Sequence, residues 1–199
     1  MIVITNPIPI AYETNTIHSL FAEGLKLLHI RKPDFSEEKM KAFLREIGLE
    51  YKNRLVLHQH HSLAEAFGIN RIHFTEKMRN ETSKEKLKFW KEKSFHLSTS
   101  IHKMEDFNFL ENVFEYAFLS PVFPSISKEN YLPKYDFPVE IKKRSNFTTR
   151  LVALGGISSE NIHQALTLGF DDVALLGTIW NSDKPIENFK QCQQIALSH

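Results

Sequence analysis

The chain has little of several features that would assign it to a class at once. Its 199 residues include one cysteine, Cys192, which excludes an intramolecular disulfide and fits a reducing compartment. The net charge is only +1, so no broad field favours nucleic acid or an anionic membrane. The apolar run at residues 1–6 is short and has no basic leader, which predicts a first strand rather than a signal peptide or membrane span. With no linker or low-complexity tract, we expect one cytoplasmic domain over residues 1–199.

What the chain does have is a regular alternation of short apolar runs with amphipathic or polar segments. Eight such runs in succession are typical of parallel βα units. The expected strands are residues 2–5, 25–31, 54–58, 71–74, 95–98, 116–120, 150–154 and 172–176, and the clearest helices are 36–49, 62–67 and 159–168. The pattern predicts an α/β fold, a single (β/α)8 TIM barrel. A doubly wound open sheet is the alternative, since periodicity does not reveal closure.

Two late strands end in glycine and lead towards helices. Gly155 and Gly156 follow the seventh expected strand, and Gly177 follows the eighth. Glycine lets the main chain approach an anion closely, and the N–H groups at a helix start supply donors and partial positive charge. In a (β/α)8 barrel the loops after strands 7 and 8 frequently bind phosphate. We therefore expect a phosphorylated ligand at these glycines.

The longest expected loop follows the sixth strand and is chemically rich. Ser125 and Ser127 alternate and precede Lys128, so two hydroxyls and one ammonium can converge on one anion. A surface turn with ordinary polar residues is the alternative. Because strands 6, 7 and 8 are neighbours in a barrel, the anion-binding interpretation gains weight from the glycines that follow.

Seven short segments, in order along the chain, match the motifs of one known family. They are residues 29–33, 55–64, 68–74, 98–102, 121–128, 154–157 and 174–177. Residues 29–33 look like that family's Gln-x-Arg-Glu-Lys stretch, and residues 121–128 are similar to its Gly-Pro-Ile-Phe-Pro-Thr-x-Thr-Lys loop, with serine for threonine. On these motifs the chain resembles the thiamine phosphate synthase / TenI superfamily, which acts in thiamine biosynthesis.

The resemblance implies a barrel that binds a thiazole phosphate, a small phosphorylated substrate, on one side of its mouth. The implied thiazole-phosphate ligands are Ser125, Ser127, Gly156, Leu176 and Gly177. On the other side a synthase holds a pyrimidine pyrophosphate, and the implied residues are His29, Arg31, Lys32, His58, Ser100 and Lys128. There magnesium helps the pyrophosphate leave. In TenI-type relatives, proton shifts instead aromatise the thiazole phosphate, with a histidine after strand 5, which here is His102.

The magnesium half of the family pattern is altered in this chain. Gln59 stands at one expected carboxylate position and Met78 at the other, with Glu76 close by. Magnesium prefers hard oxygen ligands and usually one or two carboxylates. We therefore expect no metal and no cofactor, with magnesium needed only if synthase activity is retained. Pro33 stands where the family's Arg-Glu-Lys stretch has its lysine, although Lys32 leaves a cation nearby.

The thiazole half and His102 are kept. An imidazole, with an ordinary pKa near 6.5, moves protons between carbon and solvent at neutral pH. Tautomerisation of a bound heterocycle needs little beyond such a group and a fixed phosphate handle. The residues thus favour a TenI-like thiazole tautomerase with His102 as general acid/base. The alternatives are a thiamine phosphate synthase and a non-catalytic thiazole-phosphate binding or regulatory protein. Nucleic-acid and membrane partners are not expected, and a homo-oligomer is possible.

Several of the ten histidines fall at expected strand ends. Residues two apart on a strand share a face, so His58 and His60 can point into the mouth together, as can His29 and Arg31. A proton relay or a transition-metal site is one interpretation. Hydrogen-bonded polar residues that fill the space of lost ligands are the other, and it is preferred because no spacing completes a standard zinc pattern. His73 is expected to be structural.

Overall fold

The computed structural model describes residues 1–124 and 135–199, which form a closed barrel of eight parallel strands. The strands are β1 (Ile2–Ile4), β2 (Leu27–Ile30), β3 (Leu55–Leu57), β4 (Arg71–Phe74), β5 (His96–Ile101), β6 (Phe114–Leu119), β7 (Arg150–Leu154) and β8 (Asp172–Leu175). Each strand pairs with the next, and β8 pairs with β1. The predicted (β/α)8 barrel is therefore confirmed over the open-sheet alternative.

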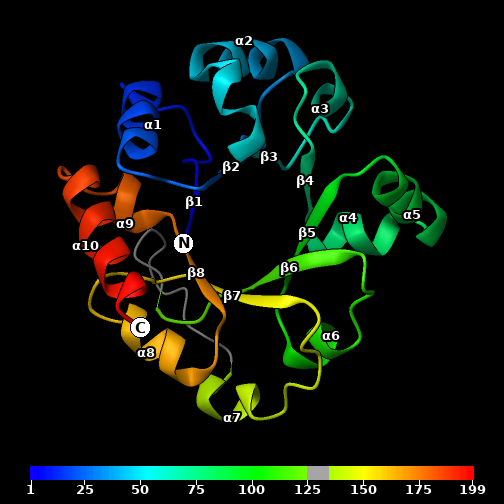
Figure 1. The fold of residues 1–199 in the computed structure, drawn as a ribbon, viewed down its shortest axis with the longest axis vertical. Helices are drawn as coiled ribbons and strands as arrows, with labels where there is room; N and C mark the ends of the chain where they lie inside the picture. The colour runs from blue at the N-terminus through cyan, green and yellow to red at the C-terminus, as the bar shows by residue number, and fades with distance from the viewer. Residues whose placement is uncertain (125–134) are drawn as a thin grey trace.

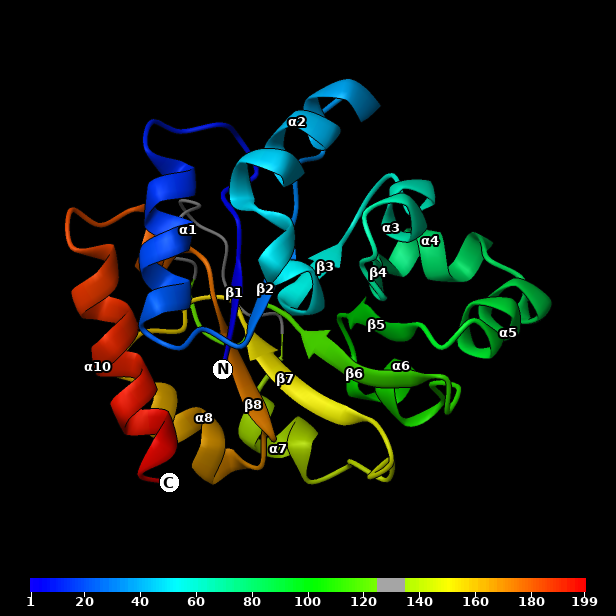
Figure 2. The ribbon, with the colours of Figure 1, turned by 45° about the horizontal axis from the view of Figure 1, so that its top comes forward.

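The helices surround the ring of strands in chain order (Figure 1). They are α1 (Glu13–Ala22), α2 (Glu37–Ile47), α3 (Ser62–Ala66), α4 (Glu76–Glu81), α5 (Lys84–Glu92), α6 (Met104–Asn108), α7 (Phe137–Ile141), α8 (Ile162–Leu168), α9 (Gly177–Trp180) and α10 (Pro185–Leu197), with a 3-10 helix, η1 (Leu49–Arg54). Near the two ends of the chain, α1 packs beside α10 (Figure 2). Within the two described ranges, no helix is long and apolar enough to cross a membrane.

The helix after β7 starts later than the sequence predicts. The expected helix at 159–168 begins only at Ile162. Asn161 explains the delay, because its side-chain oxygen accepts the Ser158 N–H at 2.9 Å and its amide donates to the Gly156 carbonyl at 2.8 Å. These two bonds hold residues 158–161 in a turn, so the Gly155–Gly156 loop does not run directly into a helix.

The barrel interior is divided into an apolar part and a polar part. The apolar part is a cluster from β1, β6, β7 and β8 made of Ile2, Ile4, Tyr116, Phe118, Val152 and Ala174. The polar part comes from β2, β4, β5 and the residue after β3, and consists of His29, His58, His73, Ser98 and Ser100. Alternate residues of a strand point to the same face. The residue types at the inward-facing positions of each strand therefore decide whether that part of the interior is apolar or polar. The larger apolar core lies between the strands and the outer helices.

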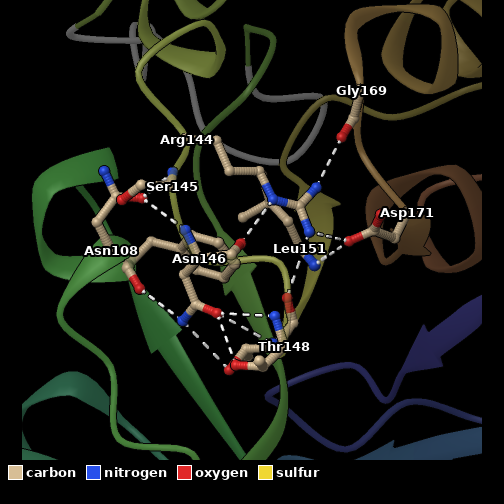
Figure 3. Close-up of polar contacts among 10 residues, drawn as sticks. Asn108, Arg144, Ser145, Asn146, Thr148, Leu151, Gly169 and Asp171 are labelled. Atoms are coloured by element: carbon tan, nitrogen blue, oxygen red, sulfur yellow. Dashed lines mark hydrogen bonds and ion pairs between the residues drawn. The ribbon is translucent and has the colours of Figure 1, made fainter.

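A polar network fastens the segment before β7 to the turn before β8 (Figure 3). The Arg144 guanidinium donates to the carbonyls of Gly169 and Thr149 and to the Asp171 carboxylate, at 3.0, 3.3 and 2.6 Å. Asp171 also accepts the Leu151 N–H at 2.7 Å. These groups lie at the amino ends of the two strands. They therefore fix the glycine-bearing strands from the end opposite to their loops.

Candidate active site

A cavity of about 330 Å³ opens at the carboxyl ends of the strands. Its described lining includes Arg31 but no aspartate or glutamate, so among these residues no carboxylate offsets the guanidinium charge. The volume lies at the lower end of the range for small-molecule pockets, about 300–1,000 Å³. The cavity therefore suits a small anionic ligand.

Most of the described candidate residues come together here. Arg31, His58, Ser100, His102, Gly156, Leu176 and Gly177 all line the cavity. His29 lies in the barrel interior with none of its surface exposed, in contact with His58. Ser125, Ser127 and Lys128 lie outside the described residues.

Lys32 is not brought to the cavity. Its ammonium is buried 2.5 Å from Glu13 Oε2 and 3.2 Å from the Ile8 carbonyl. Burial lowers the pKa of Lys32 and raises the pKa of Glu13, and their mutual attraction opposes both shifts. Adjacent residues of an extended segment point to opposite sides, so Lys32 faces α1 while Arg31 faces the mouth. The cation expected near the pyrophosphate side is thus part of the packing between α1 and the barrel.

The paired glycines permit a close contact between two loops. Gly155 and Gly156 have φ values of +94° and +67°. A Cβ on Gly155 would lie 2.9 Å from Pro121 Cα, and one on Gly156 would lie 2.3 Å from the Pro124 carbonyl oxygen. The sequence predicts that these glycines let an anion approach the main chain closely. In the structure, part of that space is taken by the loop after β6, which packs against both glycines. The N–H groups of Gly156 and Gly177 have no backbone partner among the described residues, which leaves them able to face an anion.

His102 is oriented by two neighbours at the edge of the cavity. Its Nδ1 lies 2.7 Å from the Ser120 carbonyl oxygen, which only accepts, so Nδ1 carries the hydrogen. In the neutral ring, Nε2 then holds the lone pair, and Glu76 Oε2 lies 3.9 Å from it. The side chain is half-exposed. An imidazole in this tautomer accepts a proton at Nε2.

The positions of the family's magnesium ligands are occupied by groups with other roles. Gln59 Oε1 accepts the Lys32 backbone N–H at 3.3 Å, and the Met78 side chain packs against the apolar core. The other carboxylate oxygen of Glu76 lies 3.9 Å from the Arg79 guanidinium. None of these three candidate positions is among the described residues that line the cavity. The residues present do not fit a magnesium ion.

Three histidines from neighbouring strands meet beneath the cavity. His29 Nδ1 lies 2.9 Å from His58 Nε2, and the rings of His58 and His73 stack with their centroids 4.1 Å apart. Burial is the main cause that holds the pKa of His29 and His58 well below the ordinary value, and it lowers that of His73 to about 3. All three rings are therefore neutral at physiological pH.

The sequence leaves a proton relay or a transition-metal site built from imidazoles as one interpretation, but its spacing does not group these three histidines. It paired His58 with His60, but His60 has φ +52° and its Nε2 lies 2.8 Å from the Phe35 carbonyl oxygen, away from the cluster. The signal that finds the cluster is strand register, since His29 pairs with Val56 and His58 is the next residue on the same face. That register is known only once the barrel is closed.

The fold and the site together define a class, a (β/α)8 barrel with a small-molecule cavity at the carboxyl ends of its strands, where enzymes of this fold hold their substrates. A family model described as thiamine monophosphate synthase matches residues 1–179. The chain belongs to this family of thiamine-biosynthesis enzymes.

Individual relatives are similar at a lower level. The thiamine-phosphate synthase of Dictyoglomus turgidum is 25% identical over 182 residues, which cover 89% of this chain and 80% of that protein. A thiamine phosphate pyrophosphorylase structure from Bacteroides thetaiotaomicron has a TM-score of 0.78 and 27% identity, and the match covers 100% of this chain and 98% of the other. A pyrophosphorylase structure from Pyrococcus furiosus, at TM-score 0.76 and 16% identity over 99% and 95% of the two chains, shares the fold.

Proposed function

We propose that this protein binds a thiazole phosphate and catalyses its tautomerisation to the aromatic thiazole. The observation that carries the proposal is the position of His102, which lines the cavity with Nδ1 bonded to a carbonyl and Nε2 as its basic nitrogen. The glycine loops of β7 and β8 line the same cavity. A base and a phosphate-binding loop therefore face one small space.

The phosphate is assigned to the glycine loops. The N–H groups of Gly156 and Gly177 supply donors, and Arg31 supplies positive charge within the cavity lining. With only four residues α9 contributes little macrodipole, so binding rests on individual N–H groups and on Arg31. Ser125 and Ser127, which follow Pro124 in the chain, remain proposed ligands on the strength of the family resemblance.

The chemistry consists of removing one proton from the ring and returning it to an atom outside the ring. His102 Nε2 takes a proton from a ring carbon, while the Ser120 carbonyl holds Nδ1 of the imidazole. The same nitrogen then delivers the proton to a carbon attached to the ring, which leaves the ring aromatic. Holding the phosphate fixes the ring at the base, which replaces a bimolecular encounter by a positioned one.

The test is turnover of the non-aromatic thiazole phosphate tautomer supplied alone, followed by ultraviolet absorbance and NMR. His102→Ala is expected to lower kcat by about 10²–10⁴-fold, the usual contribution of a general acid/base, while the affinity for thiazole phosphate stays near that of the parent. His163→Ala, which changes an exposed histidine on α8, is the matched control and keeps the parent rate. Unchanged turnover in His102→Ala would remove this residue from the mechanism.

A second candidate, thiamine phosphate synthase, is favoured by the names of the family and its relatives. Arg31 and Ser100, two of the residues implied for the pyrimidine side, also line the cavity. A synthase would join pyrimidine pyrophosphate to thiazole phosphate and would need magnesium to do so. Measurable binding of thiazole phosphate without either reaction would leave the third possibility, a binding or regulatory protein.

A further inference from the structure

Beneath the cavity, the three buried imidazoles of His29, His58 and His73 each offer a ring nitrogen, and these atoms all lie within 4.8 Å of one another. We propose that the three histidines form a binding site for one transition-metal ion, with zinc as the favoured metal. This site is independent of the proposed tautomerase chemistry, because His102 and Glu76 are not part of it.

The donor set decides the kind of metal. Three imidazoles without a carboxylate suit zinc, copper, nickel or iron rather than magnesium or calcium. Three histidines with one open position are the ligand set of one type of catalytic zinc site. The ion proposed here is therefore chemically distinct from the magnesium of the family, because Gln59 and Met78 stand where the resemblance implies carboxylate ligands.

Two of the three rings, those of His29 and His73, are held by hydroxyl groups. Metal-binding histidines are usually oriented by a hydrogen bond from the other ring nitrogen. His29 Nε2 lies 2.7 Å from the Tyr116 hydroxyl, which leaves Nδ1 towards the cluster. His73 lies 2.9 Å from Ser98 at Nδ1 and 2.9 Å from Ser100 at Nε2. Whichever nitrogen of His73 binds the ion, the other keeps a hydroxyl partner.

Metal binding requires three local changes in the cluster, the first of which is that His73 gives up its hydrogen bond to Ser98 or to Ser100. Tetrahedral zinc with Zn–N bonds of about 2.0–2.1 Å places its ligand nitrogens roughly 3.4 Å apart. The 2.9 Å contact between His29 and His58 is then replaced by two bonds to the ion. The stacked rings of His58 and His73, at 4.1 Å, open to admit it.

The open coordination position faces the cavity, because His58 and Ser100 both line it. The nearby lining carries Arg31 and, among the described residues, no carboxylate, so the charge of a divalent ion is not balanced by these side chains. An anion from solution must supply the balance. We therefore expect inorganic phosphate or pyrophosphate to strengthen zinc binding, by occupying the fourth position.

The experiment titrates the full-length protein, first stripped with a chelator, with Zn²⁺ in competition with a chromophoric chelator, and separately with Co²⁺. We expect one ion per chain and the intense visible absorption of tetrahedral cobalt. His58→Ala and His73→Ala should each weaken zinc binding by at least about tenfold. His60→Asn is the control, since Asn tolerates the positive φ and the His60 ring contacts the Phe35 carbonyl instead of the cluster.

A further variant separates the loss of a ligand from the loss of the fold. Tyr116→Phe removes only the hydroxyl that faces His29, so it should weaken zinc binding several-fold while the metal-free circular dichroism spectrum stays unchanged. The proposal is overturned if the folded parent protein takes up no zinc in the competition. It is also overturned if zinc binding survives His58→Ala and is lost in His102→Ala, which would place the ion at the His102–Glu76 pair.

Discussion

The two halves of the barrel mouth are built from the same βα repeat and yet differ in how they can hold a ligand. In the half formed by β6, β7 and β8, glycine loops cover an apolar interior and present backbone N–H groups. In the half formed by β2 to β5, imidazoles and hydroxyls fill the interior and make a hydrogen-bonded cluster. Backbone N–H groups remain available after any substitution that keeps the glycines. A site made of side chains changes whenever one of those side chains is substituted.

This difference fits the way the chain resembles the family, which is closer at the glycine loops than on the opposite side of the cavity. Gly156 and Gly177 line the cavity, so the proposed binding of a phosphorylated thiazole rests on the half made of backbone groups. Gln59 and Met78 stand where the family resemblance implies two carboxylates, so the proposed function does not call for magnesium.

The largest expected effect is an acid sensitivity to which the three histidines of the barrel interior contribute, together with His61, whose pKa burial lowers to about 4. His29, His58 and His73 have folded-state pKa values below the unfolded value near 6.5, so the unfolded chain binds more protons below that pH. Their stabilising contribution is complete above about pH 6.5 and is lost as pH falls, by roughly 1.4 kcal/mol per pH unit for each histidine. Urea denaturation of the metal-free protein between pH 7.5 and 5 measures this slope.

A variant that cannot titrate gives the control for this prediction. His58→Gln keeps a polar side chain but binds no proton in this range, so the slope should fall by about one proton. Equal slopes for parent and variant would mean that the buried rings are not neutral in the folded state.

Removing the charge of Lys32 should cost about 3–5 kcal/mol of unfolding free energy, because it leaves Glu13 buried without its partner. The variant Lys32→Met keeps most of the packing, and the double change with Glu13→Gln should recover much of the loss. Thiazole-phosphate affinity should not change. Arg31→Met is the matched comparison, since it lies in the cavity lining and should lower affinity with little effect on stability. A lower thiazole-phosphate affinity in Lys32→Met would mean that Lys32 contributes to ligand binding at the cavity.

Gly156→Ala should cost about 3 kcal/mol, from the left-handed backbone strain and from a Cβ that would lie 2.3 Å from the Pro124 carbonyl oxygen. Thiazole-phosphate affinity should fall with it, because the loop after β6 must move. Gly24→Ala is the control, since Gly24 has φ +90° but its Cβ would only reach Gln193 at 3.6 Å. The difference between the two variants, measured by denaturation and by ligand titration, isolates the contact between the loops.

The smallest effect is expected at the amino ends of β7 and β8. Arg144→Ala removes bonds to Gly169, Thr149 and Asp171 and should cost about 1.5–3 kcal/mol, as for hydrogen bonds to a charged group. Lys143→Ala, which removes an exposed pair with Glu140, should cost under about 1 kcal/mol. If both variants lose the same stability by chemical denaturation, the network of Figure 3 does not anchor the glycine-bearing strands.

Much of the fold follows from local patterns in the sequence. The apolar runs mark all eight strands to within a few residues, and Ser36 caps α2 by accepting the Lys39 N–H. The late start of α8 could not be predicted as readily, because it depends on two hydrogen bonds of one side chain, Asn161. Closure of the barrel also lies beyond periodicity, since it is a property of how the strands pair.

The site was predictable where function depends on a residue's place at a strand end. Arg31, Ser100 and His102 line the cavity as the motif order suggests. The orientation of Lys32 and the contact between His29 and His58 could not be predicted from the sequence. Both depend on which face of a segment points inward and on the register between strands. Such facts belong to the tertiary structure, and no spacing along the chain contains them.

One assay of the parent protein, with the thiazole phosphate tautomer, pyrimidine pyrophosphate and either magnesium or a chelator, separates the proposed tautomerase from a synthase. We expect the tautomer to be aromatised at the same rate in both conditions and no thiamine phosphate to form. Thiamine phosphate that appears only with magnesium would contradict the proposed function, since the protein would then act as a magnesium-dependent synthase.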